Sequence, residues 1–161
     1  MMATDNRDPA DRPNRIHWPP VIYAIVLATA GLLQGLAPLP APYATPVARL
    51  AGTVLVIGGI IAAVVGILQF RSIGTPVDPT GYARVLAHSG IYAHTRNPMY
   101  LGAVLAAIGG GLALPSTWLL LLSIPMAVAL TKLAITREEA FLTRRFGDAY
   151  LAYKSRVRRW L

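Results

Sequence analysis

The most constraining feature of the chain is residues 101–133, a stretch that is almost wholly apolar. A Pro-Ser-Thr triplet at 115–117 and a proline at position 125 are its main interruptions. A helix needs roughly 20 apolar residues to cross the hydrocarbon core of a bilayer, with about 17 as the lower limit. The stretch therefore predicts a hairpin of two membrane-spanning helices, whose outer ends return to the same face of the membrane.

Two further apolar runs precede this hairpin, so the sequence predicts four spans. We expect them at 21–37, 50–70, 98–114 and 117–135. The chain has 161 residues, of which 55% are hydrophobic and 14% charged. A soluble domain of this size has too little interior to hide so much apolar sequence. The predicted fold class is an all-α integral membrane protein, with a disordered polar tail at 1–17 and a single membrane domain at 18–161.

Small residues in the second span predict how it packs. Glycines stand at positions 52, 58, 59 and 66. In lipid, small residues let two helices approach closely. We therefore interpret these glycines as a helix-packing surface rather than as part of a ligand site.

Charge placement predicts how the spans are oriented. With four spans, 14 of the 15 Lys and Arg residues fall on one side of the membrane and only Arg49 on the other. Short loops rich in Lys and Arg stay in the cytoplasm, so both termini are expected to be cytosolic and the protein to lie in a bacterial inner membrane. The net charge of +8 then reflects topology and attraction to anionic lipid heads. We expect no nucleic-acid partner.

The chain has no cysteine, which excludes disulfides, thiolate metal sites and thiol nucleophiles. Its three histidines, His17, His88 and His94, show no paired helical spacing. We therefore expect no metal site.

Polar side chains gather just before and just after the hairpin, where the topology brings them to one face. The first segment contains Gly90, Tyr92, His94, Arg96, Asn97, Pro98, Tyr100 and Gly102, and the second contains Arg137, Glu138 and Glu139. Asn97 suits a helix N-cap and Pro98 the first helical position. Capping does not explain Arg96 or the two tyrosines, so the pattern indicates a site.

From Glu138 onward, apolar and aromatic residues recur at helical spacing. They are Leu142, Phe146, Tyr150, Tyr153, Val157 and Trp160. A single stripe with basic residues away from it predicts an amphipathic helix at about 138–159, lying on the cytosolic membrane surface. Gly147 is a candidate bend in this helix.

Taken in order, these segments resemble the membrane methyltransferases that include isoprenylcysteine carboxyl methyltransferases and phospholipid N-methyltransferases. The matching pieces are Gly74-Thr75, Ser89-Gly90, Arg96 to Gly102, Glu138-Glu139, and Phe146-Gly147 with Tyr150 and Tyr153. They extend over roughly 71–158, more than half of the chain. The resemblance implies S-adenosylmethionine as methyl donor, a multi-helix membrane fold and a cofactor pocket at the cytosolic face.

Carried over by position, the resemblance places the cofactor against Arg96, Asn97, Pro98, Tyr100, Gly102, Glu138 and Glu139. Residue chemistry is consistent with this and adds Gly90 and Tyr92. Arg96 offers a planar fork for the donor's carboxylate, and tyrosine ring faces suit its sulfonium. Asn97 stands where the isoprenylcysteine branch usually has His, whereas Asn-Pro-Met-Tyr is similar to the phospholipid branch. Ile91 stands where Pro is frequent.

Methyl transfer is an in-line displacement, so positioning and desolvation should supply most of the catalysis. A carboxylate acceptor needs no base, but an amine must first lose a proton. His94 and Glu138 are the candidate bases, and Arg137 is a candidate for orienting an anionic acceptor. The predicted function is methyl transfer to a lipid or lipidated acceptor, of the isoprenylcysteine carboxylate or phospholipid amine type, with the bilayer and that acceptor as partners.

Two other functions remain open from the sequence: a small four-helix transporter and a non-catalytic membrane scaffold. Proton-coupled exporters usually need an ionisable residue inside a span, and the four spans contain no Asp, Glu, Arg or His. A scaffold would leave the Glu-Glu and Arg-Asn-Pro-Met-Tyr segments unexplained. There are also simpler structural alternatives for the site residues. Arg96 and Arg137 would then only anchor the chain at the membrane surface, and Glu138-Glu139 would only begin a helix. The sequence does not indicate which oligomeric state the protein adopts.

Overall fold

The computed structural model describes residues 17–74 and 85–161, and every regular element within these ranges is helical. The predicted polar tail, apart from His17, and Thr75 of the Gly74-Thr75 match lie outside the described residues. The elements are α1 (Trp18–Leu36), α2 (Pro46–Ser72), the 3-10 turn η2 (Gly90–Ala93), α3 (Pro98–Ala113), α4 (Thr117–Leu130), the π-helical segment η3 (Thr131–Ile135), α5 (Thr136–Phe146) and α6 (Asp148–Arg156).

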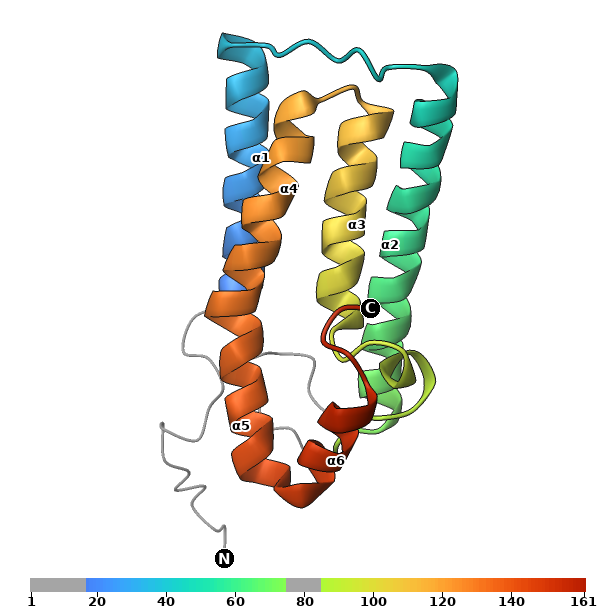
Figure 1. The fold of residues 1–161 in the computed structure, drawn as a ribbon, viewed down its shortest axis with the longest axis vertical. Helices are drawn as coiled ribbons and strands as arrows, with labels where there is room; N and C mark the ends of the chain where they lie inside the picture. The colour runs from blue at the N-terminus through green and yellow to red at the C-terminus, as the bar shows by residue number, and fades with distance from the viewer. Residues whose placement is uncertain (1–16, 75–84) are drawn as a thin grey trace, which may run out of the picture.

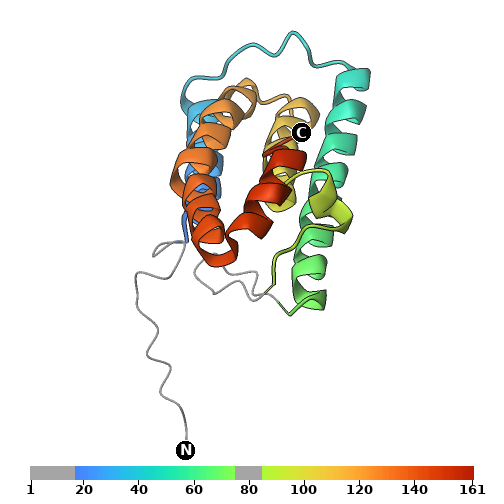
Figure 2. The ribbon, with the colours of Figure 1, turned by 60° about the horizontal axis from the view of Figure 1, so that its bottom comes forward.

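Four long helices stand side by side, with α1 against α4 and α2 against α3 (Figure 1). The segment between α1 and α2 crosses one end of the bundle, and the loop carrying η2, together with α5 and α6, lies at the other end (Figures 1 and 2). We call this second end the site end.

In the described part of the chain, three helices are long and apolar enough to cross a membrane: α1, α2 and the continuous helix Thr117–Phe146. The fourth, α3, is apolar but has only 16 residues, about 24 Å at 1.5 Å per residue. The predicted all-α membrane fold with about four spans is confirmed.

Glycines bring α2 and α3 together along their length. The buried residues of α2 are Gly52, Gly59 and Gly66, spaced seven residues apart. A Cβ atom on Gly52 would lie 2.5 Å from the carbonyl oxygen of Gly109, and one on Gly109 would lie 2.5 Å from that of Gly52. Gly59 and Gly102 meet in the same reciprocal way. The predicted packing role is right for these glycines, but Gly58 has nothing within 4 Å of an added Cβ.

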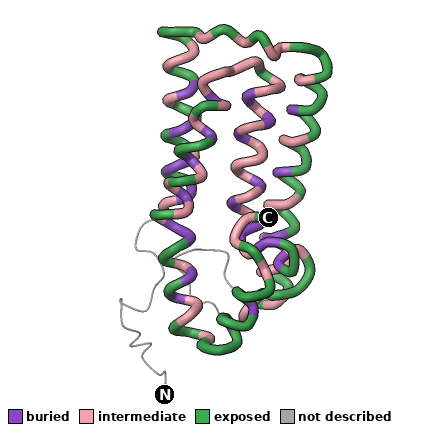
Figure 3. The backbone as a smooth tube through the Cα atoms, in the orientation of Figure 1, coloured by how far each residue is buried: buried purple, intermediate pink, exposed green. Residues whose placement is uncertain are grey.

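The apolar core lies where α1, α3 and α4 converge, and α2 presents most of its surface outward (Figure 3). Leu130, Ala134 and Ile135 are completely buried there. The outer side chains of α2, such as Ile57 and Ile61, are more than half exposed. This distribution suits a bundle whose outer face meets lipid rather than water.

The π-helical segment η3 accommodates one additional residue in the longest helix. The N–H of Thr136 is directed to the carbonyl of Thr131, five residues earlier. The buried residues along this part of the helix are Leu130, Ala134, Ile135 and Glu139. The π-helical turn takes up the additional residue without a break in the helix, and Glu139 beyond it is buried.

The predicted single amphipathic helix at about 138–159 is instead two helices. Its first part, α5, continues the fourth span without a break, and the chain then turns at Gly147, which has φ +54° and ψ −128°. Residues other than glycine rarely adopt this backbone conformation. The turn carries α6 back toward the loop that holds η2 (Figure 2). The aromatic residues on the two sides of the turn therefore do not form one stripe.

Candidate functional site

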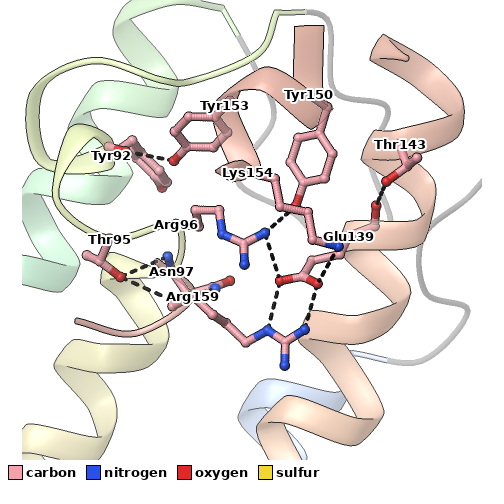
Figure 4. Close-up of polar contacts among 10 residues, drawn as sticks. All are labelled: Tyr92, Thr95, Arg96, Asn97, Glu139, Thr143, Tyr150, Tyr153, Lys154 and Arg159. Carbon is pink, nitrogen blue, oxygen red and sulfur yellow. Dashed lines mark hydrogen bonds and ion pairs between the residues drawn. The ribbon is translucent and has the colours of Figure 1, made fainter. Parts of the chain in front are cut away.

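The two polar segments that flank the hairpin meet at the site end of the bundle, as predicted. Arg96 comes from the loop before α3, and Glu139 comes from α5 (Figure 4). Arg159, which follows α6, joins them and completes the cluster (Figure 4). The site is thus assembled from three separate stretches of chain.

Glu139 is the centre of this cluster, and its side chain is only 9% exposed. Arg159 binds it with two parallel hydrogen bonds, from Nε to Oε1 at 2.9 Å and from Nη2 to Oε2 at 2.8 Å. Arg96 contacts Oε1 through Nη1 at 3.2 Å, and Lys154 lies 3.8 Å from Oε2. The hydrogen bond to Glu139 raises the pKa of Arg159 above its usual value, so the pair stays charged at any physiological pH.

In the guanidinium of Arg96, Nη1 forms polar contacts, whereas Nε forms none. Its Nη1 also donates to the hydroxyl of Tyr150 at 3.3 Å, and burial raises the pKa of Tyr150, which keeps that hydroxyl neutral. The Nε of Arg96 is buried and has no hydrogen-bond partner. A buried donor on a charged group costs free energy unless it is paired, which makes this atom a candidate ligand contact.

The C-terminal residues hold the segment before α3 in place. The backbone N–H of Arg96 donates to the carbonyl of Arg158 at 3.0 Å. Asn97 Nδ2 and Thr95 Oγ1 both donate to the carbonyl of Arg159, at 2.9 and 3.3 Å. Asn97 precedes α3 as predicted, but its side chain does not cap the helix. The side chain binds the C-terminal segment instead.

Two tyrosines and Glu138 lie next to this cluster. The hydroxyl of Tyr100 donates to Oε1 of Glu138 at 2.5 Å. Tyr92 stacks on Phe70 of α2, with ring centroids 4.9 Å apart, and its backbone carbonyl accepts a hydrogen bond from the hydroxyl of Tyr153 at 2.7 Å. The hydroxyl of Tyr92 is buried without a partner. It is therefore a second polar atom that a ligand would satisfy.

The remaining predicted residues have mainly local roles or lie outside the cluster. Gly90 has φ +56° and packs on Gln69, Pro98 begins α3, and Gly102 meets Gly59. His94 and Arg137 are exposed, and no contact of the described residues brings them into the cluster.

Sequence reasoning missed Arg159 and Lys154 as site residues. Both were interpreted only as basic residues away from the amphipathic stripe, and Tyr150 only as a member of that stripe and of the family match. No spacing rule would have found Arg159, because it reaches Glu139 only after the turn at Gly147 has reversed the chain.

An apolar groove runs from the site end along the bundle between α1 and α2, with α3 at its base. It consists of two adjoining cavities of about 300 and 570 Å³ that share Tyr23, Ala103 and Ala106. Tyr100, the partner of Glu138, lines the cavity nearer the site end. The apolar groove therefore ends beside the charged residues of the site.

These groups can bind a small ligand that carries both an anion and a cation or hydroxyl. Arg96 Nε and the Tyr92 hydroxyl are buried without partners, and Glu138 supplies a carboxylate. A planar guanidinium suits a carboxylate or phosphate. No group of His, Cys, Asp and Glu suitable for a metal ion occurs in the described part of the chain.

Comparison with known proteins agrees with this chemistry. The family model for phospholipid methyltransferases matches residues 47–149. An uncharacterized protein of Haemophilus influenzae is 38% identical over 63 residues, which are 39% of this chain and all of that protein. The protein-S-isoprenylcysteine O-methyltransferase of Schizosaccharomyces pombe is 36% identical over 73 residues, which are 45% of this chain but only 31% of the yeast protein. No solved structure matches. By the extent of the family match, the chain belongs to the phospholipid methyltransferase family.

Proposed function

We propose that this protein is an S-adenosylmethionine-dependent methyltransferase that modifies a lipid or lipidated acceptor at the cytosolic face of a bacterial inner membrane. The observation that carries the proposal is the pair of buried, unpartnered polar atoms, Arg96 Nε and the Tyr92 hydroxyl. Both belong to a segment inside the family match, and Tyr100 of the same segment lines an apolar groove. A scaffold or a transporter would give neither atom a function.

The donor's functional groups fit the residues present. S-adenosylmethionine supplies an electrophilic methyl group on a sulfonium. We assign its carboxylate to Arg96 and its ammonium or ribose hydroxyls to Glu138, and the aromatic rings of Tyr92 and Tyr100 suit the sulfonium. Both carboxylate oxygens of Glu139 already pair with cations. We therefore propose that Glu139 acts on the cofactor through Arg96 rather than by direct contact.

The groove suggests how the acceptor approaches. It lies between α1 and α2 and is lined almost entirely by apolar groups, so a hydrocarbon chain fits it better than a soluble substrate does. Its site end lies beside Tyr100. We propose that the acceptor's chain occupies the groove and that its reacting carboxylate or amine lies near Glu138.

Glu138 is the better placed of the two candidate bases. His94 is exposed, whereas Glu138 is partly buried beside the groove and is held by Tyr100. For an amine acceptor, we assign the proton to Glu138. Arg137 is exposed, and from there it can contact only the headgroup of an anionic acceptor.

Calorimetry of S-adenosylhomocysteine binding to the detergent-purified protein tests the proposal. We expect micromolar binding that Arg96→Ala and Glu138→Ala abolish. Arg144→Ala is the matched control, because Arg144 is an exposed residue of α5 at the same end of the bundle. Absence of binding to well-folded wild-type protein would contradict the proposal and favour a scaffold.

A further inference from the structure

Glu139 is shared unequally between two guanidinium groups. Arg159 binds both carboxylate oxygens, with hydrogen bonds of 2.9 and 2.8 Å. Arg96 touches only Oε1, through Nη1 at 3.2 Å. The side chains of Arg96 and Glu139 are each only 9% exposed, so water does not compete strongly for either of them.

This unequal sharing of Glu139 determines which nitrogen of Arg96 is available to a ligand. A guanidinium and a carboxylate prefer a two-point pair. Because Arg159 already forms that pair with Glu139, Arg96 is left with a single contact to this carboxylate, and its Nε stays buried without a partner. If Arg159 were absent, Glu139 would be free to rotate and to bind both Nε and a terminal nitrogen of Arg96.

The backbone fixes Arg159 where it can have this effect. The carbonyl of Arg158 accepts from the backbone N–H of Arg96 at 3.0 Å, and the carbonyl of Arg159 accepts from Asn97 and Thr95 (Figure 4). The C-terminal segment is therefore attached to the same loop that carries Arg96. The positions of the two arginines are linked through backbone as well as through Glu139.

We propose that Arg159 is a positioning residue that engages Glu139 and thereby keeps the Nε edge of Arg96 free for the anionic group of a ligand. The inference rests on the proposed function in that the anionic group is the carboxylate of the methyl donor. It differs from a purely structural role for the cluster in one respect. Neutralising Glu139 should repair the loss of Arg159, whereas removing a second member of a structural cluster only weakens it further.

The test measures S-adenosylhomocysteine affinity in four purified variants: Arg159→Met, Glu139→Gln, the double variant that combines them, and Arg158→Met as the control. Arg158 is exposed and adjacent, and its contact with Arg96 uses the backbone. We expect Arg159→Met to weaken binding about tenfold or more, the loss of one charged hydrogen bond. The double variant should recover most of that loss, and Arg158→Met should bind like the wild type.

A double variant that binds as weakly as Arg159→Met or more weakly would overturn the inference. So would wild-type affinity in Arg159→Met. If Arg159→Met does not fold, Arg159→Lys replaces it, because lysine keeps the charge but cannot form the two-point pair. Arg159→Lys should then bind with reduced affinity, and Glu139→Gln should again restore it.

A second readout needs no ligand. In the free protein labelled with ¹⁵N-arginine, the Nε–H resonance of Arg96 is assigned by its loss in Arg96→Lys. We expect Arg159→Met to shift this resonance as Nε becomes bonded to Glu139, and Glu139→Gln to reverse the shift. This pattern in a protein that binds no S-adenosylhomocysteine would refute the proposed function while supporting the relation between the two arginines. An unshifted resonance would refute that relation.

Discussion

Tyr100 and Glu138 lie 38 residues apart and are joined by a 2.5 Å hydrogen bond from the tyrosine hydroxyl to Oε1 of the carboxylate. Tyr100 belongs to the first turn of α3 and Glu138 to α5, so the bond connects the two arms of the hairpin at the site end. Tyr100 also lines the groove. The carboxylate of Glu138 is therefore held between the groove and the ionic cluster.

Tyr100→Phe should lower the rate of methyl transfer about 10- to 100-fold, because an unpaired polar group in a partly buried setting costs about 1–3 kcal/mol. Initial rates with a lipid-extract acceptor measure the effect. Tyr43→Phe is the control, since Tyr43 bonds Gly111 and Thr117 at the opposite end of the bundle. A wild-type rate in Tyr100→Phe would show that Glu138 does not depend on this bond.

Ile60→Trp should slow methylation of long-chain acceptors and leave S-adenosylhomocysteine affinity unchanged, because Ile60 lines the groove and a larger side chain narrows it. The acceptor KM and the cofactor affinity are measured side by side. Ile61→Trp is the matched control: Ile61 is 56% exposed, Ile60 is 54% exposed, and Ile61 does not line the groove. Equal effects of both substitutions would argue against acceptor binding in the groove.

Gly102→Ala should destabilise the bundle by about 1–3 kcal/mol, the usual cost of overpacking, because its Cβ would collide with the backbone of Gly59. Gly58→Ala should be neutral or slightly stabilising, since nothing lies near an added Cβ there and alanine is the better helix former. Thermal unfolding in detergent compares the two. A Gly102→Ala protein as stable as the wild type would show that α2 and α3 can separate without penalty.

The sequence was sufficient to predict the hairpin and the meeting of its two polar ends. Apolar runs of membrane-spanning length leave few alternatives, so the meeting of the segments that carry Tyr100 and Glu138 follows from topology once the spans are counted. The hydrogen bond between these two residues was not predicted. The role of Arg159 could not be predicted from the membrane spans. Its contact with Glu139 requires a reversal at Gly147, and one glycine in an amphipathic stretch does not specify the direction of a turn. A capping role was expected for Asn97 because its partner in the structure, the carbonyl of Arg159, also lies beyond this turn.

Deletion of Lys132 should leave cofactor binding intact. The π-helical segment Thr131–Ile135 holds one residue more than a regular α-helix, so removal of one residue returns the helix to α geometry and leaves Glu138 and Glu139 on the same face. Insertion of one alanine after Thr136 should instead rotate both glutamates by about 100° and abolish binding.

Calorimetry and thermal unfolding of these two variants separate loss of register from loss of fold. Lys132 is exposed, so its deletion removes no buried side chain. If the deletion abolished binding while the protein stayed folded, the segment would have a role beyond register.

Tyr153→Phe should reduce the loss of stability at alkaline pH. Burial raises the pKa of Tyr153, so the folded protein keeps this proton while the unfolded chain releases it near its ordinary value of about 10. The contribution is fully present below pH ~10 and is lost as the pH rises above it, by at most about 1.4 kcal/mol per pH unit for one proton. Near neutral pH the variant should be less stable by about 1–2 kcal/mol, because the bond to the Tyr92 carbonyl is absent. Unfolding free energies from pH 8 to 11 in detergent measure both effects, and an unchanged alkaline slope in Tyr153→Phe would mean that this hydroxyl titrates alike in the folded and unfolded protein.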